Sequence, residues 1–204
     1  MSDTTLKSLL AGIANNSVVP YLGAGALQGS VDKMTQAAIP ADSDSLILAM
    51  NGGKPMAPRL MWEFARAAMD VELKRGRKAV HTFLEDTYGK RQWTRAPIHD
   101  WLASIKPQYV IDINRDTQLQ DTYAEQPHTL VRGTARIAGT NYRFTLNEYS
   151  VGSGYREITQ AEVNPALPVL FKPMGSPRPD AVYIASDADY VDYDAGDVRR
   201  GWVC

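Results

Sequence analysis

The sequence has little of what builds metal centres and disulfides. Its 204 residues include one cysteine, Cys204, so an internal disulfide and a zinc site of cysteine pairs are both excluded. The three histidines (His81, His99 and His128) have none of the spacings of zinc enzymes. We therefore expect no metal, and the single thiol favours a reducing compartment.

A long apolar run and an excess of one charge are also missing. No stretch approaches the ~20 apolar residues that cross a bilayer, and residues 1–5 do not resemble a signal peptide. Lys and Arg number 22 against 23 Asp and Glu, which argues against bulk electrostatic capture of nucleic acid or an anionic membrane. The densest basic segment, residues 74–78, is typical of a solvated helix end, with a phosphate site as the alternative. We expect a cytoplasmic protein.

The sequence does contain the pattern of one α/β domain over residues 1–204. Hydrophobic residues make up 44% of it, enough for a core, and we find no repeat or domain boundary. Apolar spacing predicts helices over residues 5–15, 58–74, 77–88, 97–105 and 117–124. Apolar runs bounded by turn residues predict strands over residues 17–22, 108–113, 168–172 and 181–185. Residues 45–50 fit either a helix or a strand.

After Thr129 the hydrophobic period changes from helical to alternating. Residues 130–137 and 142–149 flank a turn at 138–141, which predicts a β-hairpin. The order of elements before it is that of a Rossmann-like, mostly parallel sheet flanked by helices, with the hairpin as an insertion. The acidic residues near the C-terminus are expected to form a solvated segment that starts a helix: Asp187, Asp189, Asp192, Asp194 and Asp197.

Glycine turns follow two of the predicted strands. Residues 17–22 run into Gly23-Ala24-Gly25, where the backbone can approach a pyrophosphate closely. A tight turn between strand and helix is the alternative. Residues 168–172 likewise run into a glycine turn, and a plain turn is the simpler interpretation there. The candidate ligand-binding residues of this second turn are Lys172, Gly175 and Ser176.

Polar residues follow the clearest strand, residues 108–113. Asp112, Asn114 and Asp116 lie at its carboxyl end, where ligands bind in open α/β sheets. Such side chains can hydrogen-bond ribose hydroxyls or hold a water. The alternative is an Asx turn in which Asp116 caps the next helix.

Taken in order, these segments resemble the SIR2-like family, the sirtuin-related NAD-binding fold, and most closely its bacterial branch without the zinc module. Gly23-Ala24-Gly25-Ala26 resembles the family's GAG phosphate loop, and residues 97–102 with 109–116 resemble its "P-x-H-x-x-L … I-x-T-T-N-Y-D" segment. Residues 169–176 resemble its "K-L-H-G-S". The resemblance spans residues 5–193. It implies NAD or ADP-ribose as the ligand, bound by the two glycine turns, with Asn114, Asp116 and Asp112 as the catalytic candidates.

The sequence departs from the family at several of these positions. Met174 occupies the position of the family's catalytic histidine, and a thioether cannot act as a base. Ala26 and Leu27 follow the GAG loop where a small polar residue is common. The chain also ends at Cys204, about where a final strand of the adenine pocket is expected.

Three functions remain open. The first is a catalytically degenerate nucleotide-binding module within a homo-oligomer or hetero-complex. The second is an active NAD glycohydrolase of the bacterial-defence type that releases nicotinamide, with an aspartate in place of the histidine. The third is a protein-interaction subunit whose pocket is filled by Met174 and Leu27.

Overall fold

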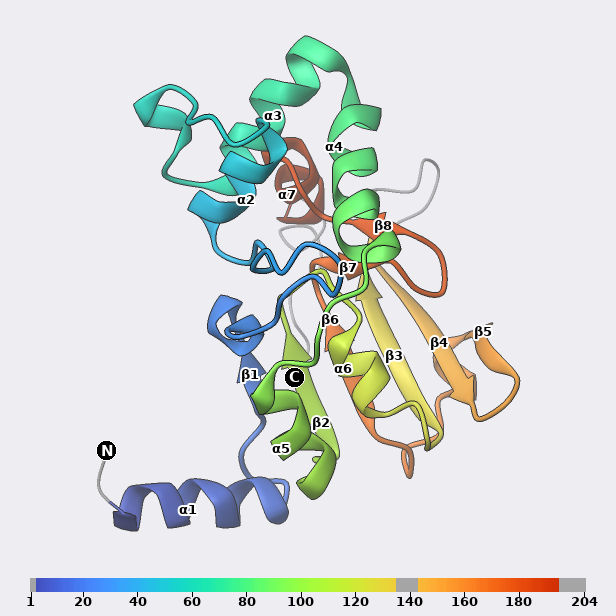
Figure 1. Ribbon diagram of the computed structural model, residues 1–204. Coiled ribbons are helices and arrows are strands. Elements are labelled where there is room, and N and C mark those ends of the chain that lie inside the picture. Colours follow the sequence, from blue (N-terminus) through green and yellow to red (C-terminus); the bar gives the residue numbers. More distant parts are fainter. Residues whose placement is uncertain (1–2, 135–142, 195–204) are drawn as a thin grey trace.

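A six-stranded sheet forms the centre of the computed structural model, which describes residues 3–134 and 143–194 (Figure 1). The strand order is β1-β2-β6-β3-β4-β5. The first four strands in this order are parallel to one another. Strand β4 pairs antiparallel with β3, and β5 pairs antiparallel with β4. The strands are β1 (Tyr21–Leu22), β2 (Tyr109–Asp112), β3 (His128–Gly133), β4 (Phe144–Ser150), β5 (Gly154–Ile158) and β6 (Val169–Lys172). The predicted α/β class with a mostly parallel sheet is confirmed, and it is consistent with a Rossmann-like arrangement.

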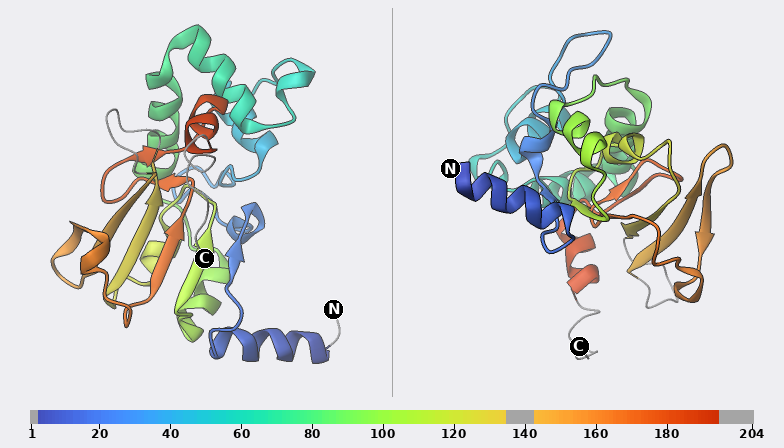
Figure 2. Two further views of the ribbon diagram at one scale, coloured as in Figure 1. Left: turned by 180° about the vertical axis from the view of Figure 1, so that it is seen from behind. Right: turned by 90° about the horizontal axis from the view of Figure 1, so that it is seen from below.

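Helices flank this sheet and extend beyond one of its edges (Figures 1 and 2). The α-helices are α1 (Asp3–Ala14), α2 (Ser43–Met50), α3 (Phe64–Arg75), α4 (Arg77–Leu84), α5 (Pro97–Ile105), α6 (Gln118–Thr122) and α7 (Asp187–Asp194). Short 3-10 helices are η1 (Ala24–Leu27), η2 (Pro58–Leu60) and η4 (Gln160–Glu162), and η3 (Glu85–Lys90) is a π-helical turn. A separate antiparallel pair consists of β7 (Gly175–Ser176) and β8 (Val182–Tyr183).

Two apolar clusters hold the layers together. The first joins α5 and α6 to the sheet through Leu102, Leu119, Val110, Leu130 and Leu170. The second is made by the helices beyond the sheet, and it includes Leu27, Ile47, Phe64, Val80 and Leu84. The carboxyl ends of the parallel strands, which we call the carboxyl edge, therefore face a helical layer of α2, α3, α4 and α7 (Figure 1). The opposite end of these strands is the amino edge.

Several element boundaries differ from the sequence-based prediction. The helix predicted over residues 58–74 is divided into η2 and α3, and its first turn has Pro58 at a helix start, where the missing N–H costs nothing. The helix predicted over residues 77–88 is divided into α4 and η3, where the carbonyl of Thr87 accepts a hydrogen bond from Trp93 Nε1 at 2.8 Å. Residues 45–50, which fitted either structure, belong to α2 with Asp42 as its N-cap.

The predicted hairpin is present as the antiparallel pair β3 and β4, and its turn at residues 138–141 lies outside the described residues. Strands β5 and β7 were not predicted. The acidic segment was expected to be solvated, but Asp189 in α7 is buried, because its carboxylate accepts from the backbone N–H groups of Ala185 and Ser186 and pairs with Arg77. Asp197 and Cys204 lie outside the described residues.

Within the described ranges, none of the helices is both long and apolar enough to cross a membrane.

Candidate functional site

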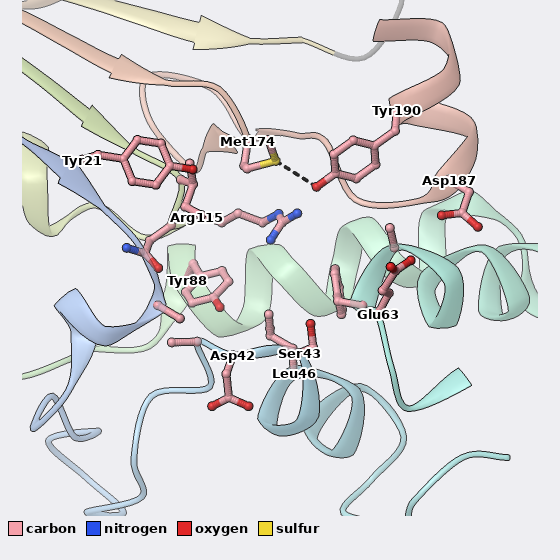
Figure 3. Close-up of a pocket in the computed structure, with 16 residues that line it drawn as sticks. Tyr21, Asp42, Ser43, Leu46, Glu63, Tyr88, Arg115, Met174, Asp187 and Tyr190 are labelled. Carbon is pink, nitrogen blue, oxygen red and sulfur yellow. Dashed lines mark hydrogen bonds between the residues drawn. The ribbon is translucent and has the colours of Figure 1, made fainter. Parts of the chain in front are cut away.

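A cavity of about 610 Å³ lies at the carboxyl edge of the sheet, between β1, β2 and the helical layer (Figure 3). This volume falls within the range of small-molecule sites, about 300–1,000 Å³. The place is also the one where open α/β sheets bind their ligands. Polar and charged residues that line it are Tyr21, Asp42, Ser43, Glu63, Tyr88, Asn114, Arg115, Asp187 and Tyr190, and apolar ones include Ala24, Leu46, Phe64, Ile113 and Met174.

Asn114 is held in the cavity wall by two neighbouring strand ends. Its backbone N–H and its Nδ2 both donate to Asp112 Oδ1, at 2.9 and 2.8 Å, and Nδ2 also donates to the carbonyl of Gly23 at 2.9 Å. The side-chain amide donor is therefore occupied within the protein. Its carbonyl oxygen has no hydrogen bond among the described residues, so it is the atom that Asn114 can offer to a ligand hydroxyl.

Asp112 and Lys172 form a fully buried ion pair beneath Asn114. Lys172 Nζ lies 2.6 Å from Asp112 Oδ2, and both side chains are at most 1% exposed. They are the last residues of the adjacent strands β2 and β6. Neither belongs to the cavity lining. Because Asp112 also accepts from Asn114, which donates to Gly23 after β1, the ion pair anchors Asn114 and connects the carboxyl ends of three strands, β1, β2 and β6.

Asp116 is buried close to this pair. Its Oδ1 accepts from the backbone N–H of Gln118 at 2.7 Å, as in the Asx turn that was the alternative interpretation, but the N-cap of α6 is Thr117. Oδ2 of Asp116 has no hydrogen-bond partner in the described structure. Burial raises the pKa of Asp116 to about 6, against the opposing effect of the Lys172 charge. The carboxyl group is thus able to hold a proton near neutrality, although it does not line the cavity.

The two glycine turns play different structural parts. Gly23 precedes η1, and a Cβ at Gly23 or Gly25 would meet nothing within 4 Å. Ala24 lines the cavity, whereas Gly25 lines a shallower depression with Gly29 and Pro97. The backbone of the first turn is therefore open to a ligand at Ala24.

The second glycine turn is closed by the fold itself. Gly175 has φ +82°, and a Cβ there would lie 2.0 Å from the carbonyl oxygen of Val182. Ser176 is buried, and its hydroxyl donates to Gln120 Oε1. The contacts with β8 and α6 give Gly175 and Ser176 a structural role, and neither residue lines the cavity.

Met174 lines the cavity, and its sulfur accepts a hydrogen bond from the Tyr190 hydroxyl at 3.0 Å (Figure 3). None of the three histidines replaces a base there. His81 contacts the Ala181 carbonyl, and His99 is buried with its pKa lowered to about 4 by desolvation. His128 lies at the amino edge, at the start of β3.

Sequence reasoning missed four charged residues of the cavity. Arg115 comes from the segment after β2, and the three carboxylates Asp42, Glu63 and Asp187 lie at or beside the N-termini of α2, α3 and α7. The position of Arg115 between Asn114 and Asp116 was a usable signal for it. The three acidic residues are far apart in sequence, and only the folded arrangement of the helices brings them together.

The fold and the cavity define the class of this protein: an α/β protein with a ligand-sized cavity at the carboxyl edge of a mostly parallel sheet. No protein-family model matches the chain, and no curated protein matches it.

Proposed function

We propose that this chain is a SIR2-like domain that binds a nucleotide of the NAD or ADP-ribose class in the cavity and turns it over slowly or not at all. The position of the cavity carries the proposal, since it lies at the carboxyl ends of β1 and β2 and is lined by Ala24 of the glycine turn and by Asn114. Its volume of about 610 Å³ fits a ligand of nucleotide size. Asn114 would accept a hydrogen bond from a ribose hydroxyl, and Ala24 would lie against the phosphates.

Weak catalysis follows from the residue at the expected base position. Met174 has no proton acceptor of useful strength, and its sulfur is already engaged by Tyr190. A general base contributes ~10²–10⁴-fold to a rate. Asp112 is neutralised by Lys172, and Asp116 is buried behind the cavity wall. Among the described residues that line the cavity there is no histidine, and the proton acceptors present are the carboxylates Asp42, Glu63 and Asp187.

An active NAD glycohydrolase is the second candidate, and the cavity carboxylates favour it. In that reaction the bond between ribose and nicotinamide breaks, and its electron pair leaves with nicotinamide, which departs as a neutral molecule. Water adds its oxygen to the sugar carbon as a hydroxyl, and its other proton is released to solvent. Negative charge beside the developing sugar cation stabilises the transition state. Glu63 and Asp187 line the cavity and carry suitable groups, so they are candidates for this role in place of Asp112 and Asp116, which do not line it.

The third function, a protein-interaction subunit with a filled pocket, is disfavoured because this cavity is present. Leu27, which was expected to help fill it, packs in the core of the helical layer and does not line the cavity. Assembly into a homo-oligomer or hetero-complex is still part of our proposal, because α1 exposes Leu6, Leu9 and Leu10. Light scattering of the purified protein would give its mass in solution.

The test of the proposed function is thermal unfolding with and without millimolar NAD or ADP-ribose, followed by an assay for released nicotinamide. A ligand at 100 times its dissociation constant adds about 2.7 kcal/mol, which is a shift of roughly 5–10 °C for a domain of this size. Asn114→Ala should abolish the shift. Asn147→Ala, which replaces a buried asparagine of β4 outside the cavity lining, serves as the matched control.

A shift without nicotinamide supports the binding module, and nicotinamide release supports the glycohydrolase. If neither ligand shifts the unfolding temperature of the folded protein, the proposed function is wrong.

A further inference from the structure

Three cations are buried among the described residues, and they differ in how their charge is balanced. Lys172 pairs with Asp112 at 2.6 Å, and Arg132 pairs with Asp180 at 2.8 Å. Arg115 forms no ion pair with a described carboxylate. A buried charge without a counter-ion is costly. Of the residues that the structure describes, Arg115 is also the only basic one that lines the cavity.

The Arg115 side chain is held in a fixed position. Its Nε and Nη2 both donate to the carbonyl of Ile184, at 2.9 and 2.7 Å, and its guanidinium lies 5.2 Å from the ring centroid of Phe64. Nη1 makes no hydrogen bond within the described part of the chain. Figure 3 shows the guanidinium extended into the cavity between Met174 and Tyr88. The group is therefore preorganised, with one nitrogen left to donate.

Other polar groups near Arg115 are already engaged. The Tyr88 hydroxyl donates to the Pro40 carbonyl, and the Tyr190 hydroxyl donates to the Met174 sulfur. Neither contact supplies a negative charge to the guanidinium. A ligand that enters the cavity and carries an anionic group would supply the counter-ion that the protein lacks.

We infer that Arg115 is the anchor for an anionic group of the ligand, a phosphate or a carboxylate bound by Nη1. The inference deepens the proposed function, on which it rests only for the identity of the ligand. Guanidinium groups bind phosphate and carboxylate by charge-assisted hydrogen bonds, which are stronger than neutral ones. The resulting ion pair lies in the cavity interior, where the effective dielectric is lower than in water and Coulomb attraction is correspondingly stronger.

Of the three described carboxylates that line the cavity, Asp187 is half-buried, whereas Asp42 and Glu63 are exposed and weaken this attraction little. Asp42 is exposed, and its carboxylate caps α2 by accepting from the backbone N–H of Ser45 at 2.9 Å. The Glu63 side chain is 66% exposed and lies 3.8 Å from Arg66. Exposed charges are hydrated and screened by salt. These carboxylates oppose a second anionic group near the mouth, so the ligand is expected to present its anion only at Arg115.

The experiment measures the dissociation constants of ADP-ribose, adenosine and inorganic pyrophosphate by calorimetry. Arg115→Gln should raise the dissociation constants of ADP-ribose and pyrophosphate by about tenfold or more. The dissociation constant of adenosine, which has no anionic group, should change by less than about twofold. Arg132→Gln is the matched control, because it removes a buried arginine that already has its carboxylate. It should leave all three constants unchanged.

Because Arg115 also holds Ile184, the test needs a second variant that keeps the arginine. Met174→Glu places a carboxylate beside the guanidinium and should remove the affinity for both anions without loss of thermal stability. This variant decides the question if Arg115→Gln does not fold. Arg115→Lys, which keeps the charge, should retain part of the affinity.

The outcomes separate the two claims. If ADP-ribose binds equally well to the wild type and to folded Arg115→Gln, the inference about Arg115 is overturned while the proposed function stands. If pyrophosphate binds through Arg115 and neither NAD nor ADP-ribose binds, the inference is supported and the proposed ligand class is wrong. Failure of the wild type to bind any of these anions overturns the inference.

Discussion

At the amino edge of the sheet, a partly buried aromatic cluster satisfies its own polar atoms, whereas at the carboxyl edge two charged groups each have an atom without a hydrogen-bond partner among the described residues. His128 stacks on Tyr149 at 4.7 Å between ring centroids, and its Nε2 lies 2.8 Å from the Tyr155 hydroxyl. Its Nδ1 contacts the Gln126 carbonyl at 3.0 Å. At the carboxyl edge, Arg115 Nη1 and Asp116 Oδ2 have no hydrogen-bond partner among the described residues.

This difference distinguishes polar groups that stabilise the sheet from polar groups that are available to a ligand. Polar atoms that the fold satisfies have nothing left to offer a ligand, and they contribute stability through their net hydrogen-bond energy. Polar atoms held rigidly without a partner make the fold less stable, and they are ready to bind. The Asp112–Lys172 pair belongs to the first kind although it lies beside the cavity. Variants on each side of this division should differ in stability and in ligand affinity.

Loss of Lys172 should produce the largest effect. Lys172→Met leaves the Asp112 carboxylate buried without its cation, which typically costs about 3–5 kcal/mol. Urea unfolding at pH 7 would measure the loss of unfolding free energy. The double variant Lys172→Met/Asp112→Asn removes both charges and keeps an oxygen for Asn114 to donate to, so it should recover most of the loss. A loss below about 1 kcal/mol for the single variant would show that the pair does not anchor this edge.

The pH dependence of stability should identify Asp116 as an incomplete group. Burial raises its pKa from 3.8 to about 6, so the folded state binds this proton more tightly than the unfolded state does. The resulting stabilisation is complete below about pH 4 and is lost as the pH rises through 6. Asp116→Asn cannot titrate. The unfolding free energy of Asp116→Asn minus that of the wild type should therefore increase by about 1–3 kcal/mol as the pH rises from 4 to 7.

The measurement is urea unfolding of both proteins at pH 4, 5, 6 and 7. The difference between them is the informative quantity, because His99 acts in the opposite direction: desolvation lowers its pKa to about 4, so its contribution rises with pH. The wild type alone can thus show a flat profile. A difference that does not change with pH would mean that Asp116 is ionised throughout the range.

The sequence was sufficient to predict part of the parallel sheet, but β3, which was expected in a hairpin insertion, pairs parallel with β6, and β1 is limited to Tyr21–Leu22. Helix α5 has the predicted bounds, and β2 and β6 lie where their apolar runs indicated. Local signals failed where tertiary contacts decide the structure. The two-residue strand β7 exists because Gly175 can approach Val182, and η3 replaces a regular helix end where Tyr88 is buried against Pro40. No periodicity encodes either contact.

The candidate site was predictable only in part. The strand ends placed Asn114 and Ala24 at the cavity, because parallel strands end at one edge. Lys172 also has its predicted position at that edge, but its pairing with Asp112 depends on the register of β2 against β6, which sequence alone does not provide. Glu63 and Asp187 belong to helices far apart in the chain, so only their packing reveals that both face the cavity.

The smallest effects should come from a pair of hydroxyl deletions, one at each region. Tyr155→Phe removes the hydrogen bond to His128 and should cost about 1 kcal/mol of unfolding free energy, without changing the dissociation constant of ADP-ribose. Tyr190→Phe removes the hydroxyl that donates to the Met174 sulfur inside the cavity. Because a thioether is a weak acceptor, its cost in stability should be smaller, while the freed Met174 side chain changes the dissociation constant. Calorimetry and urea unfolding of both variants give all four values. If Tyr155→Phe changes ligand affinity as much as Tyr190→Phe does, the two edges are coupled, and the division between a structural edge and a binding edge does not hold.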